Sequence, residues 1–313
     1  FRDQTFSADV GSAAVKRIED VRVLRAVQFP EDQGPLAHPV RPDSYIEISN
    51  FYTSTVYNKG AEVIRMFHTV LGADKFRAGT DLYFDREDGK AATCDDFVAA
   101  LEEGSGVDLE PFKIWYSQAG TPKVRARLLD DADAKTATLD LEQHLGPTPG
   151  QPLKDPMPIP LRTALLGRDS GHEICPERLI VLDQPRQSVS FENVTEPPLL
   201  SINRNFSAPV IIEAERSSDE LERLAQADTD PFARYEAMQE LMMRALVAGA
   251  RGQQLDSAPV TRAIGATLKS NSLDPAFKAE AILLPSESLI ADRLDVVDPD
   301  AIHKAREQLR SEI

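Results

Sequence analysis

Residues 115–128 read Trp115-Tyr116-Ser117-Gln118-Ala119-Gly120-Thr121-Pro122-Lys123-Val124-Arg125-Ala126-Arg127-Leu128, and two patterns meet within them. Before Gly120 the aromatic residues have helical spacing, and this helix begins near Pro111, a favourable residue for a first helical turn. After Pro122 apolar and positively charged residues alternate, which is the period of a half-buried strand. The stretch therefore predicts a boundary between a helical part and a β part of the chain.

Upstream of this boundary, residues 1–120 read as helices joined by polar connections. The clearest helix covers Gly60–Gly72, where Gly72 is a typical stop signal. Its apolar face consists of Ala61, Ile64, Phe67 and Leu71, with Val63, Met66 and Val70 beside them. Its other face consists of Glu62, Arg65 and His68, which we expect to be exposed. A second helix is predicted near Asp74–Phe84, and a third begins at Thr93 with a capping box.

Downstream of Pro122, short apolar runs alternate with Pro- and Gly-rich turns. The runs are Val124–Leu128, Ala137–Leu141, Ile159–Leu166, Leu179–Leu182, Val189–Phe191 and Val210–Ala214. Several short strands at this spacing are typical of a small all-β sandwich or barrel.

After about Glu215 the sequence predicts helices again, the first of which starts at Ser218. Three Asp-Pro pairs each place an N-cap acceptor before a first-turn proline: Asp230-Pro231, Asp274-Pro275 and Asp298-Pro299. This pattern predicts an α-solenoid or a helical bundle.

The composition narrows the class of protein. The 313 residues carry a net charge of −16, so no basic excess is available for nucleic acid, and we expect no such partner. No run approaches 18 apolar residues, so we expect no membrane partner. The two cysteines, Cys94 and Cys175, are expected to be free thiols in a reducing compartment.

Local motifs alone reveal no self-contained active site. His172-Glu173 lacks the second histidine of a zinc helix, because position 176 is a proline, and we expect a loop there. Cys94 is expected to pack rather than to react. The acidic pairs and runs are expected on solvated faces and turns: Glu31-Asp32, Asp95-Asp96, Glu102-Glu103 and Asp130-Asp131-Asp133.

One further segment, residues 50–66, reads Asn-Phe-Tyr-Thr-Ser-Thr-Val-Tyr-Asn-Lys-Gly-Ala-Glu-Val-Ile-Arg-Met. It resembles the Tyr-x-Lys-Gly-Ala-x-Val-x-x-Met signature of the M1 family of zinc aminopeptidases, most closely the bacterial aminopeptidase N branch. Further stretches in the same order resemble that family: Phe1–Gln4, His38–Pro42, Ala92–Phe97 and Trp115–Pro122. The resemblance is strong over residues 1–123, weaker over 124–215, and mainly one of helical character after that.

The resemblance implies a multidomain α+β fold. Residues 1–120 would be the α-helical latter part of a thermolysin-like catalytic domain, residues 121–215 a small β-sandwich, and residues 216–313 the start of a helical C-terminal domain. The family's His-Glu-x-x-His motif, its glutamate ligand and its Gly-x-Met-Glu-Asn segment do not occur in the chain. We therefore expect a piece of a longer protein that begins just after the metal site, with zinc as cofactor of the parent and none in this piece.

The resemblance also implies roles for individual residues. Tyr57 matches the family's catalytic tyrosine, which donates to the oxyanion of the tetrahedral intermediate. Tyr52 aligns with an aromatic that lines the pocket for the substrate's first side chain. Asp3 either orients a zinc-binding histidine or forms a helix-surface salt bridge. Structural roles are expected for Lys59, Glu62 and Arg65, with Glu62 pairing one turn away.

These observations predict a segment of a cytoplasmic zinc aminopeptidase that removes N-terminal Ala and other small, basic or apolar residues from peptides. We expect the parent to be monomeric, and the isolated chain to be inactive and to self-associate through apolar patches. The alternative is a non-catalytic interaction or structural module whose sandwich and helices bind a protein partner.

Overall fold

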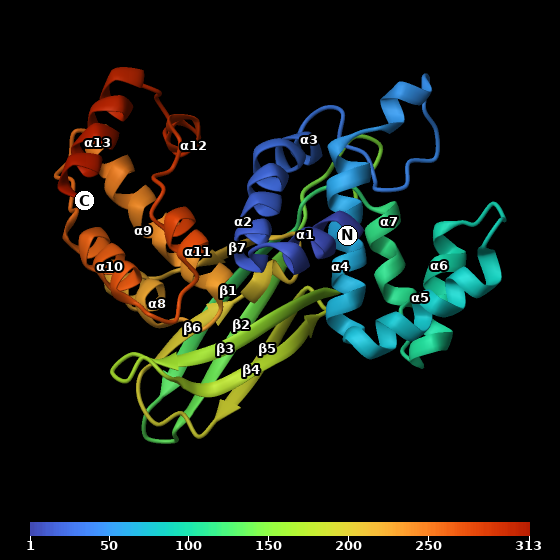
Figure 1. Cartoon of the computed structure of the whole chain (residues 1–313), viewed down its shortest axis with the longest axis horizontal. Helices are drawn as coiled ribbons and strands as arrows, with labels where there is room; N and C mark the ends of the chain where they lie inside the picture. Colours follow the sequence, from blue (N-terminus) through green and yellow to red (C-terminus); the bar gives the residue numbers. More distant parts are fainter.

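The computed structural model describes residues 1–313, and its helices and strands fall into three consecutive parts (Figure 1). The first part is helical. Its α-helices are α1 (Arg2–Val10), α2 (Ala13–Val23), α3 (Phe29–Gln33), α4 (Gly60–Leu71), α5 (Ala73–Glu87), α6 (Cys94–Ser105) and α7 (Ile114–Ser117). Two π-helical segments, η1 (Leu24–Gln28) and η3 (Thr55–Lys59), and two 3₁₀ segments, η2 (Ile48–Phe51) and η4 (Glu110–Lys113), interrupt them.

The predicted Gly60–Gly72 helix is confirmed as α4, which ends where Gly72 takes a left-handed φ of +75°. Phe67 and Leu71 of the predicted apolar face are buried, together with Val63 and Met66 beside it. Ala61 and Ile64 of that face are only half-buried, so the buried face is turned toward Val63 and Met66. The expectation for Glu62 is wrong, because its side chain is only 2% exposed. A charged group tolerates such burial only with a partner, and α2 supplies one.

The second part is a sandwich of two sheets, as predicted. One sheet has the order β5-β2-β1-β7 and the other β4-β3-β6. The strands are β1 (Lys123–Asp131), β2 (Thr136–His144), β3 (Ile159–Gly167), β4 (Glu173–Leu182), β5 (Arg186–Glu192), β6 (Pro198–Ile202) and β7 (Ile211–Ala214). The alternation after Pro122 is confirmed in β1, which pairs antiparallel with β2 and buries Val124 and Ala126.

Two strands differ from the sequence prediction. Strand β4 begins at Glu173, so the His172-Glu173 pair enters a strand rather than lying wholly in a loop. Pro176 is accommodated because β4 is the edge strand of its sheet, where a missing N–H leaves no ladder position empty. Strand β6 is not apparent from alternation, because Leu199 and Leu200 are both buried, one against each of two separate cores.

The third part is helical, with α8 (Ser218–Ala227), α9 (Pro231–Ala250), α10 (Ala258–Lys269), α11 (Pro275–Ala281), α12 (Glu287–Ala291) and α13 (Pro299–Glu312). The three Asp-Pro predictions are confirmed: Asp230, Asp274 and Asp298 each cap a helix with the side chain accepting a backbone N–H. The fold class is therefore the predicted one, a helical part followed by a β-sandwich and a second helical part.

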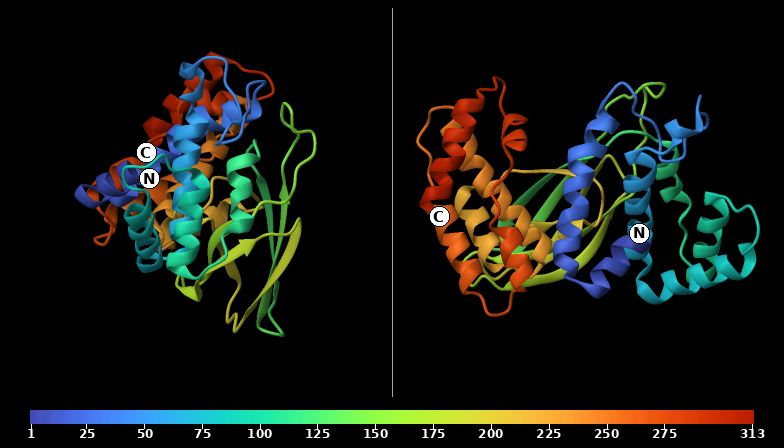
Figure 2. Two further views of the ribbon diagram at one scale, coloured as in Figure 1. Left: turned by 90° about the vertical axis from the view of Figure 1, so that its right-hand side faces the viewer. Right: turned by 45° about the horizontal axis from the view of Figure 1, so that its top comes forward.

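Residues from all three parts pack together in one apolar cluster that includes the buried face of α2. Its buried residues are Ile18, Val21, Leu24, Phe29, Phe206, Phe232, Tyr235, Phe277 and Ala281. Figure 2 shows the consequence: α2 lies between the C-terminal helices on one side and α4 with α5 and α6 on the other. No helix of the chain has the length and apolar character needed to cross a membrane.

Candidate active site

Tyr57 lies in the π-helical turn η3, which leads directly into α4. The Gly60 N–H donates to the Thr55 carbonyl, five residues back, so the turn is wider than an α-helical turn. The Tyr57 side chain is exposed, with 58% of its surface accessible. The turn thus places the tyrosine outward at the start of a helix whose opposite face is held in the core.

Tyr52 lies beside Tyr57. The two rings stack with centroids 6.0 Å apart and an interplanar angle of 26°, and Tyr52 is 61% exposed. Phe51 meets Tyr52 edge-on at 6.1 Å, and Tyr45 lies 5.7 Å from Phe51. The structure therefore brings together the two tyrosines singled out by the resemblance, at the end of a row of aromatic rings.

Two adjacent carboxylates bind the ends of η3. Glu31 Oε1 accepts from the Thr55 backbone N–H at 2.7 Å and from its hydroxyl at 2.5 Å. Asp32 Oδ2 accepts from Lys59 Nζ at 2.7 Å, and both of these side chains are almost inaccessible, at 0% and 1%. The expectation that Glu31-Asp32 is a solvated acidic pair is wrong, because both carboxylates accept hydrogen bonds from residues of η3.

Asp32 holds the most buried charge of this site. Burial acts to raise the pKa of its carboxyl group, but the Lys59 ammonium and the hydrogen bonds around it prevail, and the net shift is downward. The Gly120 N–H and the Thr121 hydroxyl also donate to this carboxylate, at 3.1 and 3.0 Å. Asp32 is therefore ionised and ties η3 to the start of the sandwich.

Glu62 has a second buried ion pair. Arg17 of α2 binds both of its oxygens, at 2.9 and 2.5 Å, and Gln4 of α1 donates at 3.0 Å. The predicted pairing of Glu62 with Lys59 or Arg65 is wrong, because tertiary partners replace the helical neighbours. Arg65 is largely buried, and burial together with the like charge of Arg17 lowers its pKa to about 10. These residues hold α4 and have the structural roles expected of them.

Asp3 lies on the surface, where its side chain is 83% exposed and accepts from Lys16 Nζ at 3.2 Å. This is the helix-surface salt bridge of the two alternatives. A role in orienting a zinc-binding histidine stays a prediction.

The chain contains no group of three His, Cys, Asp or Glu side chains arranged to hold a metal ion. The residues present therefore do not fit a zinc site by themselves. Cys94 is half-buried at the start of α6, and burial raises the pKa of its thiol, as for a packing residue.

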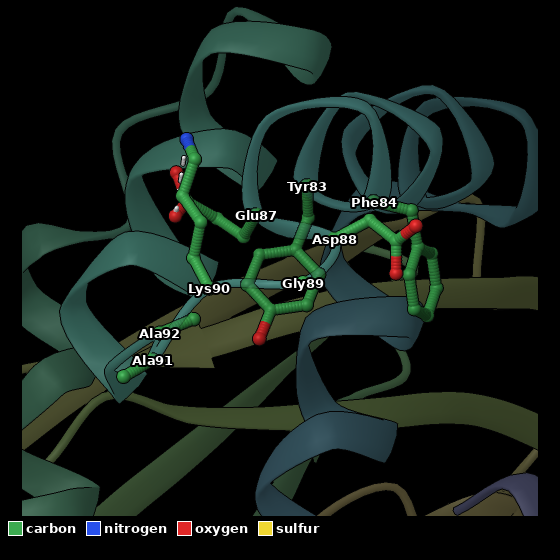
Figure 3. A pocket seen from close by; sticks show the side chains of 8 residues that line it. All are labelled: Tyr83, Phe84, Glu87, Asp88, Gly89, Lys90, Ala91 and Ala92. Carbon is green, nitrogen blue, oxygen red and sulfur yellow. Dashed lines mark ion pairs between the residues drawn. The ribbon is translucent and has the colours of Figure 1, made fainter.

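One surface hollow lies apart from the tyrosines, between the end of α5 and the loop to α6 (Figure 3). Its lining residues are Tyr83, Phe84, Glu87, Asp88, Gly89, Lys90, Ala91 and Ala92. Among these residues the Lys90 ammonium lies 3.8 Å from a Glu87 carboxylate oxygen. This hollow contains none of the residues of the candidate site.

Sequence reasoning missed Glu31 and Asp32 as parts of the site. Their partners Thr55 and Lys59 are 24 and 27 residues away, so no local periodicity connects them. One signal in the sequence pointed to an acidic partner: Lys59 lies two residues after Tyr57 in the segment that leads into a packed helix. A lysine buried at such a place needs a counter-ion.

Three consecutive parts of the chain match known protein families. Residues 7–116 match the peptidase family M1 domain, and residues 120–215 match a domain of unknown function, DUF3458, with an Ig-like fold. Residues 218–313 match the C-terminal DUF3458 family, which is described by ARM repeats. The three matches follow one another along the chain in the order of the helical part, the sandwich and the second helical part.

Individual relatives agree with these families. Aminopeptidase N of Escherichia coli K12 is 44% identical over 99% of the chain, and aminopeptidase N of Caulobacter vibrioides is 47% identical over 100% of it. The chain spans only 37% and 36% of these two relatives. A crystal structure of Legionella pneumophila aminopeptidase A in complex with aspartic acid matches 95% of the chain and 35% of its own length, with a TM-score of 0.78 and 28% identity. The match of residues 7–116 to the M1 domain, with 44% and 47% identity to two aminopeptidases N over almost the whole chain, shows that the chain belongs to peptidase family M1.

Proposed function

We propose that the chain is part of a zinc-dependent aminopeptidase that hydrolyses N-terminal residues from peptides, with Ala and other small, basic or apolar residues as substrates. The proposal depends on one observation: Tyr57 of the family signature is exposed on a turn whose two ends are bound to the core. The zinc would be held by residues outside 1–313. The two free cysteines, Cys94 and Cys175, support a reducing, cytoplasmic location. The proposal also includes a role in peptide catabolism and a monomeric enzyme.

In this proposal Tyr57 acts through its hydroxyl group. Attack on the scissile carbonyl places a negative charge on the former carbonyl oxygen. A tyrosine O–H that already points at that position donates a hydrogen bond that strengthens as the charge develops, and so lowers the barrier. In this role Tyr57 stabilises the intermediate by donating a hydrogen bond.

Tyr52 contributes to binding in the same proposal. Its ring stacks on Tyr57 and leaves most of its surface open, so it offers an apolar wall next to the reacting carbonyl. In this proposal the side chain that precedes the scissile bond packs against that wall. We therefore propose that Tyr52 lines the pocket for the first residue of the peptide.

The test uses the full-length zinc-loaded enzyme with an alanyl chromogenic amide as substrate. We expect Tyr57→Phe to lower kcat by roughly 10²–10³-fold, the usual effect of losing one oxyanion donor, with zinc content and KM little changed. Near-normal turnover would refute the catalytic role. We also expect the isolated chain 1–313 to show no turnover and no stoichiometric zinc; either one would contradict the placement of the metal ligands outside it.

A further inference from the structure

We propose that Glu31 and Asp32 are positioning residues for catalysis: together they hold both ends of the η3 turn and so fix where the Tyr57 hydroxyl points. This inference rests on the proposed function of Tyr57 and adds to it the residues that make the tyrosine effective. It concerns the short helix α3, whose pattern in the sequence indicates only a solvated acidic pair.

Glu31 holds the beginning of the turn. One carboxylate oxygen, Oε1, accepts both the backbone N–H and the hydroxyl of Thr55, and the Gln28 side-chain amide donates to the same hydroxyl at 3.3 Å. Thr55 is fully buried, so these bonds are shielded from competing water. His38 Nε2 lies 4.0 Å from the same oxygen.

Asp32 holds the end of the turn. Its Oδ2 binds Lys59 Nζ, which also donates to the Gly120 carbonyl at 2.8 Å. The other oxygen, Oδ1, accepts the Gly120 N–H. The Lys59 ammonium thus connects Asp32 of α3 to Gly120, which lies three residues before the first strand of the sandwich. It also lies 6.0 Å from the centre of the buried Trp115 ring.

Tyr57 is two residues from each of these anchors. Because Glu31 and Asp32 are neighbours in one helical turn, the two ends of η3 cannot shift independently of each other. An oxyanion donor must lie about 2.7–3.1 Å from the developing charge, and a misplacement of about 1 Å can cost as much as 10²-fold in rate. The Tyr57 side chain is exposed, so the core does not fix its position directly. Its hydroxyl can meet this distance requirement only if the backbone of η3 is held in place by Glu31 and Asp32.

The experiment measures kcat and KM of the full-length zinc-loaded enzyme for four variants in two backgrounds, the native enzyme and Tyr57→Phe. Glu31→Ala removes both bonds to Thr55, whereas Glu31→Gln keeps an amide oxygen that can accept them. Thr55→Val removes the hydroxyl and keeps the backbone N–H. Glu177→Ala is the matched control, because the Glu177 side chain is 25% exposed, as is that of Glu31, and it pairs with two arginines, Arg162 and Arg204. Glu177 differs from Glu31 in its position, since it lies in β4 of the sandwich.

In the native background we expect Glu31→Ala to lower kcat about 10-fold and Thr55→Val about 3-fold, with KM within about 2-fold. Glu31→Gln should retain most of the native kcat, because its amide oxygen can still accept both bonds from Thr55. Glu177→Ala should change kcat less than about 2-fold. In the Tyr57→Phe background Glu31→Ala should have almost no further effect, because the hydroxyl it positions is already absent.

Equal losses from Glu31→Ala in both backgrounds would overturn the inference, since they would show a general structural effect. Unchanged kcat in Glu31→Ala and Thr55→Val would overturn it as well, while leaving the role of Tyr57 intact. Near-normal turnover of Tyr57→Phe alone would instead refute the proposed function, and the positioning role with it. Should Glu31→Ala melt well below the native enzyme, Thr55→Val carries the same comparison between backgrounds.

Discussion

The substitution Asp32→Asn tests whether the buried ion pair is a real constraint on the fold. The side chain keeps its shape and an oxygen for Gly120, but Lys59 is left with its charge in a site that is 1% exposed. Removing one partner of a buried pair costs about 3–5 kcal/mol, because the remaining charge is unpaired and cut off from water. We therefore expect the free energy of unfolding to fall by about that amount.

Urea denaturation of residues 1–313, followed by tryptophan fluorescence, is a suitable assay. Trp115 is the only tryptophan of the chain, is fully buried, and has Lys59 Nζ 6.0 Å from its ring centre. Its emission therefore reports on the part of the molecule that the substitution disturbs.

The double variant Asp32→Asn with Lys59→Met removes the unpaired charge, and we expect it to recover about 2 kcal/mol or more of the loss. The surface control is Asp81→Asn, which breaks an exposed pair with Arg77 and should cost less than about 0.5 kcal/mol. A loss below about 1 kcal/mol for Asp32→Asn, or equal losses in the single and double variants, would refute the reasoning.

The same pair gives a pH dependence. The pKa of Asp32 is lower in the folded protein than its ordinary value of 3.8, so the folded state binds this proton more weakly than the unfolded state. The stability contributed by Asp32 is therefore fully present above the unfolded pKa and is lost as the pH falls through the folded pKa. Native protein should be destabilised in acid below about pH 4 by more than Asp32→Asn is.

Two further predictions concern helix geometry. Ser217→Ala removes the N-cap of α8, whose hydroxyl accepts the Glu220 N–H at 3.2 Å, and should cost about 1 kcal/mol in a urea titration. Gly104→Ala would place a Cβ 2.6 Å from the Gly79 Cα, so α5 and α6 must separate and the melting temperature should fall by several degrees. Gly146→Ala, which meets nothing within 4 Å, is its control; equal melting temperatures would contradict the close crossing.

Local sequence signals predicted a large part of the fold because the interactions behind them are local. Gly72 ends α4, Asp230 caps α9, and the alternation after Pro122 forms β1. Each of these features depends on neighbours within a few residues, so the order of helices, sandwich and helices was predictable. Strand β6 was not, because helices cover its sheet and both of its faces are apolar.

The candidate site divides in the same way. The motif that contains Tyr52 and Tyr57 lies within one short segment, so the sequence alone determined these residues as candidates. Only the tertiary structure decided their stacking, the burial of Glu62 against Arg17, and the pairing of Asp32 with Lys59. The physical reason is that each of these charged residues is buried only because a segment distant in the sequence supplies its partner. Local spacing in the sequence does not predict which distant segments come into contact.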